Sequence, residues 1–295
     1  MKSGFISLVG RPNVGKSTLL NALIGKKIAI TSNKPQTTRN IIQGIYTDSE
    51  VQMIFVDTPG IHKPKNRLGK VLNKQAYFTI NDVDVILFLV DITESLGSGD
   101  KFILEVLKNA NKPVILVINK IDLLPKEKIL EKISEYKDLY NFEEIVPVSA
   151  IKKDNVDRLR EVLKKYLPDN IKFYDDQTYT NVSTNFLISE IVREKILNLT
   201  EEEVPHSITC IVEDIKQTKD LLSINVLIVL DRENLKKIII GKQGSMLKEI
   251  GRRSRIELEN MFNTKVYLEL YVKVIPKWRD KESFLNELGY KEFNN

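Results

Sequence analysis

Residues 10 to 17 read Gly10-Arg11-Pro12-Asn13-Val14-Gly15-Lys16-Ser17, directly after the apolar run 5–9. The run that follows, 19–24, is typical of a helix. A glycine-rich loop between a strand and a helix presents successive backbone N–H groups, which can surround a polyphosphate. The stretch therefore predicts a strand, loop and helix that together bind a nucleoside triphosphate.

Two side chains of this loop carry further chemistry. Lys16 would place a positive charge beside the β and γ phosphates, and the Ser17 hydroxyl would be a ligand of Mg²⁺. The loop residues that we expect to contact the nucleotide are Gly10, Asn13, Val14, Gly15, Lys16, Ser17 and Thr18.

Size and composition limit the class of protein. A chain of 295 residues is long enough for two domains, and its net charge of +5 is compatible with a nucleic-acid partner. The one cysteine, Cys210, lies in an apolar run, which predicts a buried thiol in a reducing cytosol. Met1 leads directly into a strand-like run, so we expect no signal or transit peptide. No apolar stretch approaches the roughly 20 residues that cross a bilayer, so we expect a soluble protein, and any membrane contact would be peripheral.

The first part of the chain, residues 1–168, alternates short β-branched runs with charged helical segments. Strands are predicted at 5–10, 41–47, 51–57, 83–91, 113–119 and 144–149, and helices at 16–24, 68–79, 99–109, 126–136 and 155–167. This alternation predicts an α/β domain with a mostly parallel sheet covered on both faces. Since 41–47 and 51–57 are joined by too few residues for a parallel crossover, they form an antiparallel hairpin and the sheet is mixed.

A polar stretch at 169–182, with no helical or strand period, is interpreted as an interdomain linker. A smaller α+β domain follows at 183–275, and residues 276–295 form a C-terminal tail. In the second domain we expect, in this order, a helix at 185–199, strands at 207–216 and 221–230, a short helix at 235–240, a long helix that ends at about 261, and a strand at 266–274.

Three motifs follow predicted strands of the first domain. Asp57-Thr58-Pro59-Gly60 ends the strand at 51–56. Here a carboxylate can hold Mg²⁺, normally through water, and the Gly60 N–H can reach the γ phosphate. The alternative interpretation of this motif is an ordinary turn after a strand.

Asn119-Lys120-Ile121-Asp122 follows the strand at 114–118 and indicates the base. The Asp122 carboxylate can accept hydrogen bonds from guanine N1–H and the exocyclic amine, whereas adenine offers no such pair of donors. The alternative for Asp122 is a solvated helix cap. Ser149-Ala150, after the strand at 145–148, would place a backbone N–H near guanine O6.

In this order, the motifs resemble those of the translation-factor-related GTPases. Lys34-Pro35-Gln36-Thr37-Thr38-Arg39, Glu203-Val204-Pro205-His206-Ser207 and the run 241–278 resemble, more narrowly, the Era-like GTPases of bacteria over nearly the whole chain. The resemblance implies a P-loop GTPase domain followed by a type II KH domain. It also implies that Thr38 meets Mg²⁺ and the γ phosphate only in the triphosphate state. The alternative for residues 31–40 is a plain surface loop.

Catalytic candidates follow from this resemblance. The residue after Gly60 is Ile61, which cannot orient water as the glutamine of Ras-type GTPases does, so we expect slow intrinsic hydrolysis. In related GTPases the asparagine that Asn13 matches helps to hold K⁺, which makes K⁺ a second expected cofactor beside Mg²⁺. A turn-forming role after Pro12 is the alternative for Asn13. The catalytic candidates are Lys16, Thr38, Gly60 and Asn13.

Gly241-Lys242-Gln243-Gly244 lies between an apolar run and a long helix of the second domain. In a KH module such a loop lets the backbone approach nucleic-acid phosphates, beside a groove for about four unstacked bases. Residues 231–258 carry eight Lys or Arg and four acids, which favours a phosphate-facing surface over a merely solvated helix. The expected ligand is single-stranded RNA. Besides the loop, the expected RNA-binding residues are Lys236, Lys237, Lys248, Arg252 and Arg253.

Three other residues attract attention. His62 is interpreted as part of a mobile switch segment, and His206 as a capping or packing residue. Trp278 could stack on a base or pack against its own domain.

The sequence thus predicts a GTP-hydrolysing switch joined to an RNA-binding domain. The resemblance implies the 3′ end of small-subunit ribosomal RNA as the RNA, and maturation of the small ribosomal subunit as the role. An alternative is a nucleotide-gated RNA-binding scaffold whose unassisted hydrolysis is negligible. We expect a cytoplasmic monomer that binds GTP, GDP and the small subunit, with peripheral contact at the inner face of the cell membrane.

Overall fold

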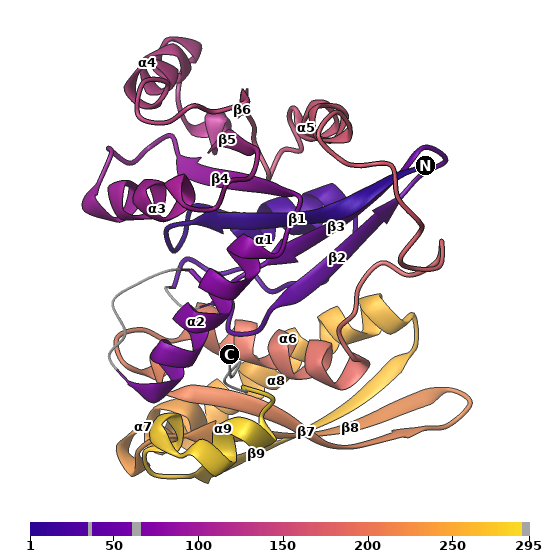
Figure 1. Cartoon of the computed structure of the whole chain (residues 1–295). Helices are drawn as coiled ribbons and strands as arrows, with labels where there is room; N and C mark the ends of the chain where they lie inside the picture. The colour runs from indigo at the N-terminus through magenta and orange to yellow at the C-terminus, as the bar shows by residue number, and fades with distance from the viewer. Residues whose placement is uncertain (35–36, 61–65, 291–295) are drawn as a thin grey trace.

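The computed structural model describes residues 1–34, 37–60 and 66–290, and two sheets divide the chain into two halves (Figure 1). Ile61 and His62, singled out above, lie outside the described residues. Among the described helices, none is both long and apolar enough to cross a membrane.

The first half is an α/β domain around a six-stranded sheet of order β2-β3-β1-β4-β5-β6, in which only β2 is antiparallel to its neighbour. Its strands are β1 (Lys2–Gly10), β2 (Ile42–Thr47), β3 (Val51–Asp57), β4 (Val85–Asp91), β5 (Val114–Asn119) and β6 (Glu144–Pro147). Its helices are α1 (Lys16–Ile24), α2 (Arg67–Asn81), α3 (Ser98–Lys108), α4 (Lys126–Tyr136) and α5 (Val156–Lys164). The mixed, mostly parallel sheet expected from the sequence is confirmed.

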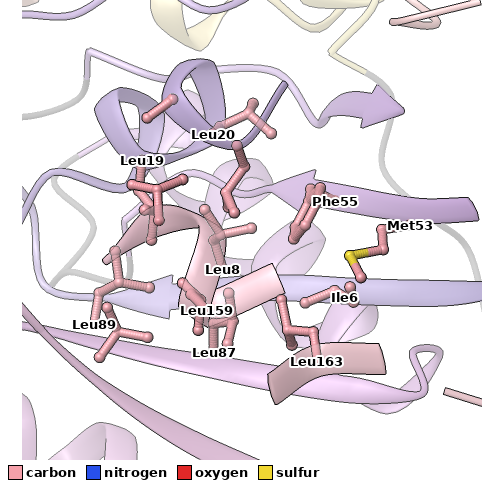
Figure 2. Close-up of a cluster of buried hydrophobic side chains, with 14 of the residues drawn as sticks. Ile6, Leu8, Leu19, Leu20, Met53, Phe55, Leu87, Leu89, Leu159 and Leu163 are labelled. Carbon is pink, nitrogen blue, oxygen red and sulfur yellow. The ribbon is translucent and has the colours of Figure 1, made fainter. Parts of the chain in front are cut away.

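Apolar side chains alternate along the strands and so form a core on each face of the sheet. On one face, Ile6 and Leu8 of β1 pack with Leu19 of α1 and Leu159 of α5 (Figure 2). The other face packs against α2, α3 and α4. Since both faces are covered, ligands can reach the sheet only at its ends, where the loops after parallel strands meet.

The predicted linker lies along the edge strand β2. Thr180 forms an isolated bridge with Gly44, and the Ile45 N–H donates to the Tyr179 carbonyl at 3.0 Å. The Gln52 side chain bonds the backbone of residues 173 and 174. These contacts cover an otherwise open sheet edge, which explains how a stretch without any periodic pattern follows a defined path.

The second half is an α+β domain with a three-stranded sheet of order β7-β8-β9. Its elements are α6 (Thr184–Leu199), β7 (Ile208–Gln217), β8 (Leu221–Leu230), α7 (Glu233–Ile240), α8 (Ser245–Phe262) and β9 (Lys265–Val274). The predicted order of helices and strands is confirmed. One face of the sheet packs against α6, α7 and α8, and the buried Cys210 belongs to this core.

The other face of this sheet receives the tail and a helix of the first domain. Trp278 and Leu285 of the tail form one cluster with Leu68 and Leu72 of α2 and with Val229 of β8. Trp278 is fully buried, and its Nε1–H donates to the Ser207 carbonyl at 3.0 Å. Of the two interpretations of Trp278, the structure therefore supports packing.

Short helices account for the main differences from the sequence prediction. Three-residue 3₁₀ turns at 121–123, 204–206, 242–244 and 278–280, and helix α9 (Glu282–Glu287) in the tail, are too short to produce a detectable period. Figure 1 shows α6 and α2 lying between the two sheets.

Candidate nucleotide site and RNA interface

The phosphate loop has the backbone that its glycines predict. Gly15 has φ +97°, and a Cβ there would lie 2.3 Å from Asn119 Nδ2, so only glycine fits. Asn119 Nδ2 donates to the Val14 carbonyl at 2.9 Å, which fixes the loop to the end of β5. Lys16 Nζ donates to the Gly10 and Arg11 carbonyls at 3.1 and 2.9 Å. Burial lowers the pKa of Lys16 to about 8, and Asp57 opposes part of this shift.

Three side chains with oxygen atoms that could be metal ligands lie close together beside the loop. Ser17 Oγ donates to Asp57 Oδ2 at 2.6 Å and lies 2.8 Å from Thr38 Oγ1. Thr38 Oγ1 is also 3.3 Å from Asp57 Oδ2. These residues come from α1, the 37–40 segment and the end of β3, so the structure brings together three side chains that are up to 40 positions apart.

The chemistry of this cluster fits a magnesium ion. Asp57 is fully buried, and its Oδ1 has no hydrogen-bond partner among the described residues. Burial raises the pKa of Asp57, while Lys16, Ser17 and Thr38 act in the opposite direction. An unpaired buried carboxylate oxygen is costly, and hydroxyl and carboxylate oxygens are the ligands that Mg²⁺ prefers.

A cavity of about 560 Å³ opens in front of these groups. This volume suits a nucleotide. Of the predicted site residues, those that line it are Asn13, Gly15, Lys16, Ser17, Thr18, Thr38, Gly60 and Lys120. The other lining residues include the exposed Ile151 and Asn198, which comes from α6 of the second domain.

The motif at 119–122 is held in place by polar contacts. Lys120 has φ +66°, and its Nζ lies 2.5 Å from Asp91 Oδ2. Ser149 Oγ donates to Oδ1 of the exposed Asp122 carboxylate at 2.5 Å, which leaves Oδ2 and the second lone pair of Oδ1 for a ligand. The Ala150 N–H donates to Asn119 Oδ1 at 3.1 Å. Recognition of guanine O6 by the Ala150 N–H stays a prediction. This N–H would have to be shared between Asn119 Oδ1 and guanine O6.

Asn13 combines features of both of its interpretations. Its φ of +68° is typical of an asparagine that forms a turn. Its Nδ2 donates to the Asn33 carbonyl at 2.8 Å, which links the phosphate loop to the 31–34 segment. The amide oxygen is the group that a potassium ion would use.

The glycine loop of the second domain connects α7 to α8. Gly241 has φ +73° and ψ 177°, a combination restricted to glycine. Gly244 has φ +77°, and in the described part of the chain nothing beyond its neighbours in sequence lies within 4 Å of a Cβ built there. Lys242 and Gln243, between the two glycines, are exposed, and so is nearly half of Ile238 one turn before. A ligand can therefore approach the backbone of this loop closely.

Basic side chains surround the glycine loop. Lys237, Lys248, Arg252 and Arg253 are exposed, and Lys236 is half-buried near Glu233. Arg252 makes a two-pronged pair with Glu249, with N–O distances of 2.8 Å, and Arg253 Nε donates to Glu249 at 2.7 Å. Hydrogen bonds from Arg252 and then Arg253 lower the pKa of Glu249 to about 2. One carboxylate thus partly neutralises two of the predicted RNA-binding arginines.

Known proteins combine the same two parts. A family model described as 50S ribosome-binding GTPase matches residues 5–120, and a KH domain model matches residues 203–279. A crystal structure of a variant of Aquifex aeolicus Era bound to GDP and AlF₄⁻ is 45% identical, with a TM-score of 0.94, over 98% of this chain and 99% of that chain. The chain belongs to the Era family.

A second structure agrees equally well. It is a structure of Era in complex with MgGDPNP and nucleotides 1506–1542 of 16S ribosomal RNA, with 45% identity, a TM-score of 0.94 and coverage of 98% of this chain and 99% of that chain. As a member of the Era family, the protein is a GTPase with a C-terminal KH domain. The family resemblance expected from the sequence motifs is confirmed.

Proposed function

We propose that this chain is a GTP-hydrolysing switch that binds the 3′ end of 16S ribosomal RNA and assists maturation of the small ribosomal subunit. The observation that carries the proposal is the convergence of Ser17, Thr38 and Asp57 beside the phosphate loop, with one buried Asp57 oxygen unpaired. The structure of Era with MgGDPNP and 16S ribosomal RNA supports both ligands.

The residues present divide the work of GTP hydrolysis. Ser17 and Thr38 would hold Mg²⁺ directly and Asp57 through water, and the ion would neutralise charge on the β and γ phosphates. Lys16 adds a second positive charge there, and the Gly60 N–H is a donor for a γ-phosphate oxygen. Water attacks the γ phosphate in line, which yields GDP and inorganic phosphate. Asp122 would select guanine, and Asn119 keeps the base motif attached to the phosphate loop.

The RNA side of the proposal rests on the KH domain. Single-stranded RNA would lie along Gly241, Lys242, Gln243 and Gly244, with the five flanking basic residues against its phosphates. We further propose the domain limits 1–168, 169–182, 183–275 and 276–295. A monomer located in the cytoplasm, with peripheral contact at the inner face of the cell membrane, completes the proposal.

Hydrolysis and its dependence on K⁺ can be tested in one experiment. Single-turnover hydrolysis of GTP should be slow alone, faster with small ribosomal subunits, and about tenfold faster in K⁺ than in Na⁺, which corresponds to about 1.4 kcal/mol of transition-state stabilisation. Asn13→Gly keeps the left-handed backbone and removes the amide oxygen, so it should abolish the difference between the two ions. Equal rates in both ions for the unaltered protein would exclude a role for K⁺. Negligible hydrolysis unless subunits are present would favour the scaffold alternative.

Removal of Glu249 should strengthen RNA binding. In Glu249→Gln the guanidinium groups of Arg252 and Arg253 lose their charged partner, so both become available to phosphates, and we expect about three- to fivefold tighter binding near 0.1 M salt. Fluorescence anisotropy with labelled single-stranded RNA over a KCl series measures this effect, which should vanish at high salt. Glu105→Gln is the matched control, because Glu105 forms a similar exposed pair with Lys108 on α3, in the other domain. An equal effect of both substitutions would mean that only net charge matters.

A further inference from the structure

The segment that carries Thr38 is bonded to the second domain at three points. The Thr31 N–H donates to Glu194 Oε1 at 2.8 Å, and Arg193 Nη2 donates to the Thr37 carbonyl. Arg39 donates to the Ile208 and Pro205 carbonyls at 2.6 and 3.0 Å. All the partners belong to α6 or to the chain around the start of β7. Thr38 therefore lies between two residues whose positions depend on the KH domain.

Both arginines are buried in the domain interface. Arg39 and Arg193 are each 1% exposed, and Glu190 pairs with Arg193 at 2.6 Å. Burial, and then the nearby charge of Arg193, lowers the pKa of Arg39 to about 10. Burial of two guanidinium groups near one carboxylate is costly, so their net contribution to stability is small or unfavourable. The definite result of their hydrogen bonds is that backbone on both sides of Thr38 is held at a fixed place.

The held backbone fixes the direction of the Thr38 side chain. Its Oγ1 lies 2.8 Å from Ser17 Oγ and 3.3 Å from Asp57 Oδ2, within the cluster assigned above to Mg²⁺. The same helix α6 also contributes Asn198 to the lining of the nucleotide cavity. If the second domain moved away, Thr38 would lose both lateral supports, and a ligand position misplaced by about 1 Å is enough to weaken a preorganised site.

We propose that the KH domain positions Thr38 for the magnesium-bound triphosphate, with Arg39 and Arg193 as positioning residues. This inference rests on the proposed role of Thr38 as a ligand in the triphosphate state. GDP lacks the γ phosphate and makes no use of Thr38, so the second domain contributes to the choice between GTP and GDP. By thermodynamic linkage, Mg²⁺ and GTP must strengthen the contact between the domains by the same factor.

The test compares binding of a non-hydrolysable GTP analogue with binding of GDP, using the full chain at millimolar Mg²⁺. In Arg39→Gln and Arg193→Gln we expect the ratio of the two affinities to fall about tenfold, while GDP affinity changes less than twofold. Arg39→Lys keeps the charge but loses the planar guanidinium group, so in this variant the affinity ratio should fall about threefold. Damage to the fold would lower both affinities together, which makes the ratio specific for positioning.

A matched control acts on the same interface without touching residues 37–39. Glu257 of α8 pairs with Lys27 of the first domain at 2.5 Å, and Glu257→Gln removes this pair. The affinity ratio should stay unchanged in this variant. A ratio lowered to the same extent as in the arginine variants would show that domain docking in general, and not these two residues, is responsible.

Thr38→Ala separates the inference from the proposed function. We expect it to lower the affinity ratio at least as much as the arginine variants. If Thr38→Ala lowers the ratio and the arginine variants do not, the positioning role is wrong and the metal site stands. If Thr38→Ala itself leaves the ratio unchanged, the proposed role of Thr38 fails. Should Arg193→Gln not fold, Arg39→Lys and Arg39→Gln carry the test alone.

Discussion

Asp122→Asn is expected to convert the protein from a guanine-nucleotide binder into a xanthine-nucleotide binder. A carboxylate accepts from both guanine N1–H and the exocyclic amine, whereas the amide presents its N–H₂ to that amine, donor against donor. Hydrogen bonds to charged groups contribute about 1.5–3 kcal/mol each. Loss of the bond to the amine, together with loss of the charged acceptor for N1–H, weakens GTP binding by roughly 10²- to 10³-fold. Xanthine has a carbonyl in place of the amine, so it restores complementarity.

The structure indicates which way the new amide will face. Ser149 Oγ donates to Asp122 Oδ1, so an asparagine keeps this bond by placing its oxygen toward Ser149 and its nitrogen toward the base. Calorimetric titration with GTP, GDP and their xanthine counterparts measures the exchange. Asp138→Asn makes the same chemical change at another exposed position of this domain, so its affinities should stay at the level of the unaltered protein. Unchanged affinity of Asp122→Asn for GTP would contradict the assignment of the base.

The phosphate loop and the motifs after the strands were predictable because their geometry is local. The turn between β1 and α1 fixes the positions of Gly15 and Lys16. The ends of β3 and β5 fix the positions of Asp57 and Asn119. The periodic spacing of apolar residues and the runs of β-branched residues also predicted the order of strands and helices in both domains. Parallel strands place their carboxyl ends at one edge of the sheet, so the sequence alone assigns separate motifs to one site.

Contacts between the domains could not be predicted in the same way. Arg193 and Asn198 lie on a helix whose pattern indicates only a core-facing side. Arg193 bonds the carbonyl of Thr37, which is more than 150 residues away in the sequence, and Asn198 lines a cavity of the first domain. Nothing in the sequence near Arg193 encodes that distant carbonyl. The burial of Trp278 depends likewise on how the tail returns to the sheet. Local sequence therefore determined the chemistry of the nucleotide site, and tertiary packing determined what holds it.

Gly244→Asp is expected to weaken binding of single-stranded RNA by about 10- to 100-fold. The added carboxylate would lie beside the RNA phosphates, and like charges 4–5 Å apart near a protein surface repel by about 1–3 kcal/mol. Gly244 is the better of the two loop glycines for this test. A Cβ at Gly241 would lie 2.7 Å from Met246 Cβ and 2.8 Å from its backbone nitrogen, so a substitution there would distort the start of α8. At Gly244, no atom of the described residues other than its chain neighbours lies within 4 Å of a Cβ built there.

Gly244→Asn separates the charge from the backbone. Asparagine and aspartate have nearly the same shape, and both tolerate the left-handed conformation that φ +77° requires. The two variants therefore share any cost of leaving glycine, and the difference between their RNA affinities measures the charge alone. Anisotropy with an RNA that matches nucleotides 1506–1542 of 16S ribosomal RNA gives both values. The difference should shrink as salt rises and the Debye length shortens, whereas GTP affinity should be equal in both variants. Equal RNA affinity of the two variants would mean that phosphates do not approach this loop, and the RNA would then have to bind elsewhere on the domain.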